Sequence, residues 1–306
     1  MSNYDFVIDF CRKLKLKVLE NELLSKHTSF KIGGPADLFI YINNEQNLSD
    51  ILKLFNLNNI PFFVLGNGSN LLVSDTGFRG VIIVLDHDFK NIKLDGKSSL
   101  ICGSGVSLSQ ACIFAMKNNL SGLEFAYGIP GAFGGALFMN AGAYGSDMSN
   151  IINQATHIDL DGNINTLNKS DMNLSYRKSL YSEKNYIITS VKINLNKDSK
   201  ENIKSRMEDI ISRRKSKQPL EYPSAGSTFK RPVNNYAAAL IESCNLKGVS
   251  IGGAMVSPKH SGFIINTGNA TAQNICDLIN LVKNRVFEQT GVLLECEVKT
   301  LGDIKI

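Results

Sequence analysis

Glycines interleaved with small polar residues occupy a short segment between two predicted strands. The segment consists of Gly66, Asn67, Gly68, Ser69 and Asn70. Glycine adopts a positive φ without steric cost, and successive backbone N–H groups in such a turn form a nest that binds an anion. Serine and asparagine add short side-chain donors. This composition indicates a diphosphate-binding loop, although an ordinary strand-to-strand turn uses the same residue types.

A second glycine-rich stretch covers residues 128–136. It contains Gly128, Ile129, Pro130, Gly131, Gly134 and Gly135, and Gly142 and Gly145 follow closely. The scarcity of large side chains lets the backbone approach a flat cofactor or its pyrophosphate. A buried helix crossing also uses small residues, but Pro130 and the closely spaced glycines argue against a regular helix. Residues 28–37 have the same character, so the three loops together predict a bound dinucleotide.

Other signature motifs of nucleotide and metal enzymes are absent from the sequence. Gly66-Asn67-Gly68 and Gly103-Ser104-Gly105 both lack the third glycine of G-x-G-x-x-G. There is no G-x-x-x-x-G-K-[ST], no H-E-x-x-H, no G-x-S-x-G and no paired metal-ligand spacing among the four histidines. We therefore expect no metal, and P-loop phosphoryl transfer, zinc hydrolysis and serine-hydrolase chemistry are disfavoured.

Composition sets further limits on the function. The 306 residues are 43% hydrophobic, and 33 basic against 28 acidic residues give a formal net charge of +5, too small to indicate nucleic-acid binding. The six cysteines form no Cys-x-x-Cys pair and indicate buried free thiols in a reducing compartment. No window reaches the ~18 apolar residues of a membrane span. We expect a cytoplasmic protein without membrane contact.

The predicted elements that position the glycine loops alternate between strand and helix patterns. An amphipathic N-terminal helix presents Val7, Phe10, Cys11 and Leu14 on one face. The other predicted helices are residues 47–59, 107–119, 197–218, 237–242 and 271–288. The predicted strands are residues 37–42, 61–65, 70–73, 80–85, 99–103, 185–195, 262–265 and 292–299, with a hairpin at 156–167 that turns at Asp161-Gly162. We divide the chain into three domains, residues 1–86, 87–198 and 199–306.

Six motifs, in order along nearly the whole chain, resemble the UDP-N-acetylenolpyruvoylglucosamine reductase family. They are HTSFKIGGPAD, VLGNGSNLLVSDTGFRGVII, GIPGAFGGALFMNAGAYG, LSYRKSLY, QPLEYPSAGSTFKRP and GVLLECEVKTLG. The interval between LSYRKS and AGSTFK is short, so the chain resembles the compact second type, which lacks an extra tyrosine-bearing loop. The resemblance implies an α+β fold with a two-part FAD-binding region of the vanillyl-alcohol-oxidase/PCMH type and a C-terminal α+β substrate-binding domain.

The resemblance also implies the reaction and its participants. The enolpyruvyl ether of UDP-N-acetylglucosamine enolpyruvate is reduced to UDP-N-acetylmuramate, a step of peptidoglycan precursor synthesis. NADPH is the reductant, and the hydride passes through non-covalently bound FAD to the vinyl carbon distant from the carboxylate. Such a reaction needs a group that polarises the carboxylate, a proton donor for the α-carbon and a cradle for the diphosphate. We expect a monomer, although the sequence does not determine the oligomeric state.

Three residues carry over from the family as catalytic candidates. Arg177 would bind the carboxylate through its guanidinium fork. Ser227 would give the proton to the α-carbon, and Glu297 would act at the carboxylate end of the site, as an acid or through hydrogen bonding. Glu295 shares a face with Glu297 on the predicted strand 292–299, so only the family motif favours Glu297. From the residues alone, a surface ion pair is the favoured explanation of Arg177, and a turn is that of Ser227.

Two lysines resemble the basic residues of the family that lie near the UDP diphosphate, Lys217 and Lys230. His260 lies in a typical family stretch, and a structural role is expected for it. A flavin oxidase of the same fold is one alternative, but such enzymes usually tether FAD through His or Cys, and no histidine lies within either principal glycine loop. A non-catalytic flavin or nucleotide-sugar binding module is another. Such a module would not need Arg177, Ser227 and Glu297 together.

Overall fold

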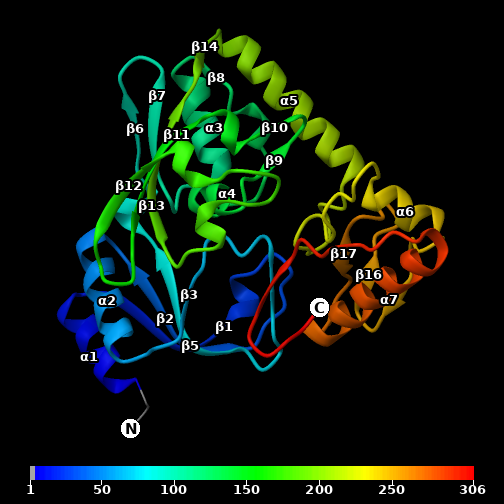
Figure 1. Cartoon of the computed structure of the whole chain (residues 1–306), viewed down its shortest axis with the longest axis horizontal. Coiled ribbons are helices and arrows are strands. Elements are labelled where there is room, and N and C mark those ends of the chain that lie inside the picture. The colour runs from blue at the N-terminus through cyan, green and yellow to red at the C-terminus, as the bar shows by residue number, and fades with distance from the viewer. Residues whose placement is uncertain (1–3) are drawn as a thin grey trace. The chain divides into compact units, whose positions relative to one another are not determined.

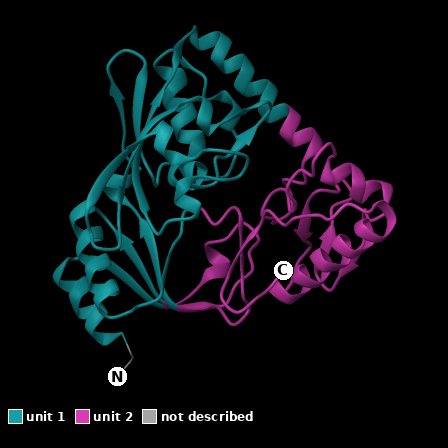
Figure 2. Ribbon diagram, in the orientation of Figure 1, with its two compact units in different colours: residues 1–20, 38–66, 80–212 teal, residues 21–37, 67–79, 213–306 magenta. Residues whose placement is uncertain are grey.

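The computed structural model describes residues 4–306, and Figure 1 labels its helices and strands. The first three residues of the predicted first domain lie outside the described residues. The chain forms two compact units (Figure 2). Unit 1 contains the residues up to 20 together with 38–66 and 80–212, and unit 2 contains residues 21–37, 67–79 and 213–306. The predicted three-domain division, with boundaries after residues 86 and 198, stays a prediction.

The first part of unit 1 is a four-stranded sheet with two helices on one face (Figure 1). The strand order is β1-β2-β5-β3, and β3 pairs with β5 in parallel. Alternate residues of β2 and β5, such as Ile40 and Ile83, are buried in one cluster with Val7 of α1 and Ile51 of α2, as the period of two predicts. The elements are α1 (Asp5–Lys13), β1 (Lys17–Leu23), β2 (Pro35–Ile42), α2 (Glu45–Leu57), β3 (Phe62–Val64) and β5 (Phe78–Leu85).

The second part of unit 1 is a five-stranded antiparallel sheet of order β12-β11-β13-β7-β6. Its strands are β6 (Ile92–Asp95), β7 (Ser99–Gly103), β11 (Ile152–Ile158), β12 (Ile164–Asn168) and β13 (Ile187–Asn194). The predicted hairpin is confirmed as β11 and β12, and Gly162 in its turn has φ +79°. Two short pairs accompany the sheet: β8 (Leu120–Ser121) with β14 (Asn196–Lys197), and β9 (Gly142–Ala143) with β10 (Ser146–Asp147).

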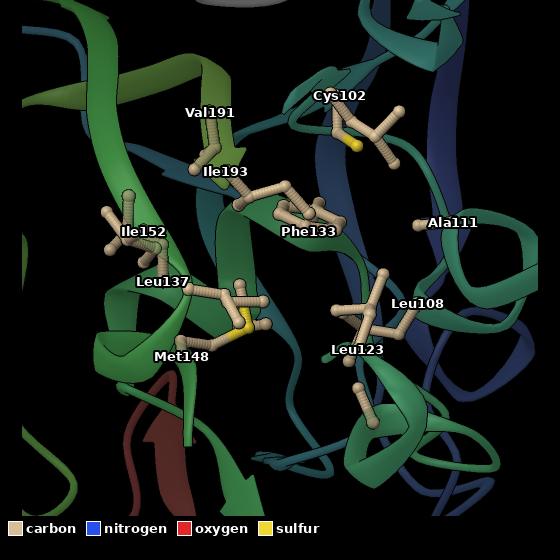
Figure 3. Packing of buried hydrophobic residues seen from close by; sticks show 14 of the residues in the cluster. Cys102, Leu108, Ala111, Leu123, Phe133, Leu137, Met148, Ile152, Val191 and Ile193 are labelled. Carbon is tan, nitrogen blue, oxygen red and sulfur yellow. The ribbon is translucent and has the colours of Figure 1, made fainter. Parts of the chain in front are cut away.

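Two helices pack their apolar residues against the core of this sheet. Helix α3 (Leu108–Lys117) begins with a capping box, in which Ser107 and Gln110 each accept the other's backbone N–H. Helix α4 (Phe133–Phe138) is short. Figure 3 shows Leu137 of α4 close to Ile152 of β11 and Phe133 of α4 close to Ile193 of β13, all within one buried cluster.

Helix α5 (Lys200–Lys217) is attached to unit 1 by apolar and charged contacts. Its Ile203 side chain is buried in the core of the five-stranded sheet. The Arg206 guanidinium contacts the buried Glu124 carboxylate at 2.8 Å and also contacts Asp198. Burial alone would raise the pKa of Glu124, but hydrogen bonds from Arg206, from backbone N–H groups and from Ser121 outweigh burial and lower that pKa.

Unit 2 combines a three-stranded antiparallel sheet, two helices and a parallel strand pair. The sheet order is β15-β16-β17, and β4 pairs with β18. Helix α7 begins where Thr271 and Asn274 form a capping box and where the Asp75 carboxylate accepts the Ala272 N–H at 2.9 Å. It ends at Gly291, whose φ is +70°. The elements are β4 (Leu71–Val73), α6 (Ala237–Ser243), β15 (Ser250–Ile251), β16 (Ala254–Val256), β17 (Ile264–Asn266), α7 (Ala272–Thr290) and β18 (Lys299–Leu301).

One predicted strand, residues 292–299, is wrong. The segment makes a single isolated bridge, between Cys296 and Phe229, and regular pairing begins only at Lys299 in β18. Hydrogen bonds from the Lys230 N–H to the Glu295 carbonyl and from the Glu297 N–H to the Thr228 carbonyl flank the bridge. In the partner segment, Pro232 has no N–H with which to continue this ladder. From Lys299 onward the segment pairs with β4 instead.

The other predicted helices and strands are confirmed, apart from small differences at their ends. All six cysteines are free thiols, five of them buried and Cys296 half-buried, as predicted. Within residues 4–306, no helix has the length and apolar character needed to cross a membrane.

Candidate active site

The first glycine loop contains one glycine that the fold of unit 2 requires. Gly68 has φ +59°, and a Cβ atom there would lie 2.2 Å from the main-chain oxygen of His27. The Gly68 carbonyl accepts the Ser29 N–H at 3.1 Å. At the end of the loop, the Asn70 side chain donates to the Glu297 carbonyl at 3.2 Å. Backbone and side-chain contacts therefore fix this turn.

Gly66, at the start of the same loop, meets a different environment in unit 1. A Cβ atom at Gly66 would lie 3.4 Å from the Ala132 Cβ, an ordinary contact distance, and Gly66 itself is exposed. The neighbouring Leu65 N–H donates to the Ile83 carbonyl at 2.8 Å, which attaches the loop to the first sheet. The protein around Gly66 therefore does not by itself demand a glycine.

The second glycine loop begins irregularly but ends in helix α4, so the expectation of a non-helical stretch is wrong from Phe133 onward. The helix starts only after Pro130 and Gly131, which explains how proline and helix coexist. The Gly134 N–H donates to the Ser104 carbonyl at 2.9 Å, and a Cβ at Gly134 would lie 2.7 Å from the Ser104 Cβ. Gly135 faces open space, because a Cβ there would meet no protein atom within 4 Å.

One feature of this second loop and one of Ser104, which contacts it, fit a bound dinucleotide. Gly135 is exposed and uncrowded within the helix, so its lack of a side chain leaves room beside the backbone. The Ser104 hydroxyl oxygen is buried and has no hydrogen-bond partner among the described residues. A buried hydroxyl without a partner is unfavourable unless a ligand or water satisfies it. The residues present therefore fit the predicted FAD.

Arg177 lies in a tight turn of unit 1. Ser175 and Lys178 exchange two backbone hydrogen bonds of 3.0 and 3.1 Å, and Arg177 between them has φ +56°. The Arg177 guanidinium donates to the Gly142 carbonyl at 3.4 Å. A positive φ is uncommon for arginine, and such strain often accompanies a functional position.

Asn140 supports this turn and was not identified by the sequence interpretation. Its side chain is buried, donates to the Ser175 carbonyl at 2.9 Å and accepts the Ser149 N–H at 2.9 Å. The only signal in the sequence was an amide residue within a glycine-rich tract, which is also common in ordinary turns.

Thr228, which follows Ser227, joins the Ser227 segment to the backbone of Glu297 in unit 2. The Thr228 carbonyl accepts the Glu297 N–H at 2.8 Å, its N–H donates to the Gly262 carbonyl at 2.8 Å, and its hydroxyl oxygen accepts the Ile264 N–H at 3.0 Å. Thr228 is fully buried, whereas Ser227 is exposed. Ser227 therefore lies at the surface of unit 2, next to a residue that hydrogen bonds hold in place.

Lys230 and Glu295, close to Thr228 and Glu297 in the sequence, form an ion pair. Their backbones are also joined, because the Lys230 N–H donates to the Glu295 carbonyl at 2.8 Å. The Glu295 side chain is 71% exposed. Lys217 is exposed at the last position of α5, where the structure gives it no link to the other candidates. The described residues contain no group of three or more His, Cys, Asp or Glu side chains that could hold a metal ion.

His260 has contacts consistent with the structural role expected for it. Its Nδ1 accepts the Gly262 N–H at 3.2 Å, and its ring packs edge-on against Phe263. Burial lowers the pKa of His260, which favours the neutral ring that this acceptor role needs. The candidates of unit 1 are Gly66, the second glycine loop and Arg177. Those of unit 2 are residues 67–70, Lys217 and the residues around Thr228.

Comparisons with known proteins show the family of the chain. Residues 36–168 match the family model described as FAD binding domain, and residues 218–301 match the one described as UDP-N-acetylenolpyruvoylglucosamine reductase, C-terminal domain. A UDP-N-acetylenolpyruvoylglucosamine reductase of Clostridium botulinum is 51% identical over 94% of this chain and 93% of its own length. A Clostridium novyi relative of the same name is 46% identical over 97% of both chains.

A solved structure is similar as well. The crystal structure of UDP-N-acetylenolpyruvylglucosamine reductase from Thermus caldophilus superposes with a TM-score of 0.80 at 33% identity, covering 94% of this chain and 99% of that one. The α+β fold class is thereby confirmed, with an FAD-binding domain followed by the C-terminal domain of this family. The assignment of the FAD-binding region to the two-part vanillyl-alcohol-oxidase/PCMH type stays a prediction. The chain belongs to the UDP-N-acetylenolpyruvoylglucosamine reductase family and is an oxidoreductase with an FAD-binding domain.

Proposed function

We propose that this chain reduces UDP-N-acetylglucosamine enolpyruvate to UDP-N-acetylmuramate with NADPH as the reductant. Family membership supports the substrate class. The observation that carries the proposal is that Thr228, a buried residue held by three hydrogen bonds, follows the exposed Ser227 and is bonded to the backbone of Glu297. The predicted cytoplasmic location and monomeric state remain predictions.

FAD would be held without a covalent bond by the two glycine loops. The residues concerned are Gly66, Asn67, Gly68, Ser69, Asn70, Gly128, Ile129, Pro130, Gly134 and Gly135. When bound, FAD supplies a carrier that accepts hydride from a nicotinamide and passes it to carbon. The backbone N–H groups of such loops are suited to the pyrophosphate, and the small residues leave room for a flat ring.

The chain's own groups would handle the carboxylate, the proton and the diphosphate. Arg177 stays charged at every working pH and is suited to bind the substrate carboxylate in two places, which stabilises negative charge as it spreads from the α-carbon. Ser227 would give its hydroxyl proton to that carbon, so that an O–H bond breaks as a C–H bond forms, and solvent would reprotonate the oxygen. Glu297 would hydrogen-bond at the carboxylate end, and Lys217 and Lys230 would contact the diphosphate.

Anaerobic stopped-flow absorbance of the flavin tests this assignment by separating the two half-reactions. We expect NADPH to bleach the flavin and UDP-N-acetylglucosamine enolpyruvate to restore it without oxygen. Ser227→Ala should leave the bleaching unchanged and slow the recovery by about 10²–10⁴-fold, the usual contribution of a general acid. Ser243→Ala, which removes a hydroxyl bonded only within helix α6, is the matched control and should behave as wild type.

Three outcomes would contradict the proposal. Absence of bound flavin would favour a binding module, and recovery that requires oxygen would favour an oxidase. Normal recovery in Ser227→Ala would remove Ser227 from the proton transfer.

A further inference from the structure

Residues 28–32 of unit 2 form a rigid turn between the glycine loop and the Ser227 segment. Phe30 and Ile32 are buried in the core of unit 2. The Thr28 hydroxyl donates to the Ile32 carbonyl at 3.0 Å, and Thr28 is itself buried. Lys31 has φ +58°, which completes the turn. Ser29 is therefore held in place from both sides.

Ser29 makes hydrogen bonds to two segments that are distant in the sequence. Its backbone N–H donates to the Gly68 carbonyl at 3.1 Å. Its hydroxyl lies 2.6 Å from the Ser224 carbonyl oxygen and 3.4 Å from that of Gly68, so the proton is directed at Ser224. One residue thus connects the predicted flavin loop to the segment that carries the predicted proton donor.

Asn266 strengthens the same connection. Its buried side-chain amide donates to the Phe30 carbonyl at 3.0 Å, and its backbone N–H donates to the Pro223 carbonyl at 2.9 Å. The turn at 28–32 and the start of the Ser227 segment are therefore attached at two neighbouring points. The Ser29 hydroxyl is the attachment nearer to Ser227.

The position of Ser227 depends on what holds the residues on either side of it. Downstream, Thr228 is fixed by its N–H, carbonyl and hydroxyl groups. Upstream, Gly226 has φ +77° and would leave an added Cβ in open space, so packing does not restrain it. Before it, Ala225 is buried in the core of unit 2 and Ser224 forms a backbone bridge with Ile265. The Ser29 hydroxyl bond to the Ser224 carbonyl is the side-chain hydrogen bond that adds to these restraints on this side.

We propose that Ser29 is a positioning residue for proton donation, because its hydroxyl fixes Ser224, and through it Ser227, relative to Gly68. The inference rests on the proposed role of Ser227. Loss of the hydroxyl would free the Ser224 carbonyl while the backbone bond from Ser29 to Gly68 remains. Flavin binding would then persist while the proton donor loses its fixed distance, and small misplacements of a catalytic group slow a reaction strongly.

The experiment compares Ser29→Ala and Ser29→Thr in the flavin-loaded enzyme. In Ser29→Ala, we expect unchanged flavin content, unchanged bleaching by NADPH, and about tenfold slower recovery on adding UDP-N-acetylglucosamine enolpyruvate. Ser29→Thr keeps the hydroxyl and should restore the recovery. Ser49→Ala is the matched control, because it removes a buried long-range hydroxyl–carbonyl bond of 2.7 Å to Gly162 in unit 1; it should leave both half-reactions unchanged.

Amide hydrogen exchange of residues 224–230 gives a readout that does not depend on turnover. Exchange should accelerate in Ser29→Ala, remain slow in Ser29→Thr and be unaffected in Ser49→Ala. If Ser29→Ala folds poorly, Ser29→Thr and Ser29→Val provide the same comparison with side chains of equal shape.

Failure of the inference can be told apart from failure of the proposed function by measuring Ser227→Ala in parallel. Slow recovery in Ser227→Ala with normal recovery in Ser29→Ala would overturn the role of Ser29 alone. Normal recovery in both variants would remove Ser227 from the proton transfer and the inferred role of Ser29 with it, whereas failure of the NADPH-reduced wild type to recover on adding the substrate would overturn the proposed function. Unchanged exchange of residues 224–230 in Ser29→Ala would refute the positioning contact whatever the kinetics show.

Discussion

Two adjacent glycines of helix α4 should respond in opposite ways to the addition of a methyl group. An added Cβ at Gly134 would lie 2.7 Å from the Ser104 Cβ, whereas one at Gly135 would meet no protein atom within 4 Å. Both positions have ordinary helical backbone, since neither has a positive φ. Substitution by alanine therefore separates the needs of the fold from those of a ligand.

The magnitudes follow from these surroundings. Alanine in a helix interior is favoured over glycine by about 0.5–1 kcal/mol, so Gly135→Ala should raise the free energy of unfolding of the flavin-free protein by that amount. Gly134→Ala has the same gain but must displace Ser104, and overpacking costs about 1–3 kcal/mol. We therefore expect the free energy of unfolding of Gly134→Ala to fall by about 1–2 kcal/mol. Urea denaturation followed by far-UV circular dichroism measures both values.

Gly135→Ala, which should stabilise the flavin-free protein, should nevertheless weaken the binding of FAD. If the ring or the pyrophosphate of FAD approaches this glycine, the added methyl group should weaken FAD binding by at least about tenfold, or 1.4 kcal/mol. A titration followed by flavin fluorescence measures this affinity. A Gly135→Ala protein that is as stable as expected and binds FAD as tightly as wild type would refute the placement of FAD at Gly135. A destabilised Gly135→Ala protein would instead refute the open space seen beside it.

Two further predictions concern stability and thiol reactivity. Arg206→Ala should lower the free energy of unfolding by about 1–3 kcal/mol, because it leaves the buried Glu124 carboxylate without its guanidinium partner. The control Lys204→Ala, which breaks an exposed ion pair with Glu208, should change the free energy of unfolding by less than about 0.5 kcal/mol. Because the pKa of Glu124 is lowered in the folded state, the contribution of its carboxylate to the free energy of unfolding is complete above about pH 5 and is lost as the pH falls. The difference in free energy of unfolding between wild type and Arg206→Ala should therefore narrow in acid. A difference that does not change with pH would contradict the ion pair. A disulfide reagent at pH 8 should label Cys296 first, yet slowly, because burial raises the pKa of Cys296 to about 11; mass spectrometry of the labelled peptides checks the order, and faster labelling of any other cysteine would contradict it.

For residues 292–299, the sequence pattern predicted which side chains are buried but not whether the segment pairs with another strand. Leu294 and Val298 alternate with acidic residues and are both buried, so the period-two pattern at residues 292–299 was informative about which side chains face the core. Strand formation also requires a partner that can continue the ladder, and the partner segment ends at Pro232. A pattern within one segment contains no information about its partner, which is why the strand prediction was wrong.

The glycine loops show a similar limit. Composition indicated two loops with unusually little side-chain volume, and Gly68 and Gly128 indeed have positive φ. Composition could not distinguish Gly134, which the protein itself requires, from Gly135, which faces open space. Nor could it predict Ser29, whose hydroxyl acceptor is 195 residues away in the sequence. Such contacts are set by tertiary structure, and no local pattern encodes them.

The choice between Glu295 and Glu297, which the residue pattern left open, can be argued from how each is held. The Glu295 side chain is 71% exposed and pairs with Lys230, and exposed ion pairs contribute about 0–1 kcal/mol. A diphosphate could therefore take Lys230 from Glu295 at small cost, so this ion pair is compatible with the predicted role of Lys230. The backbone of Glu297 makes two hydrogen bonds, to Thr228 and from Asn70 of the glycine loop, whereas the backbone of Glu295 accepts one, from Lys230. Because a group that acts on a reacting substrate must keep a fixed distance from it, the two backbone bonds of Glu297 and the exposed ion pair of Glu295 support the prediction of Glu297 for that role, with Glu295 as an exchangeable partner of Lys230.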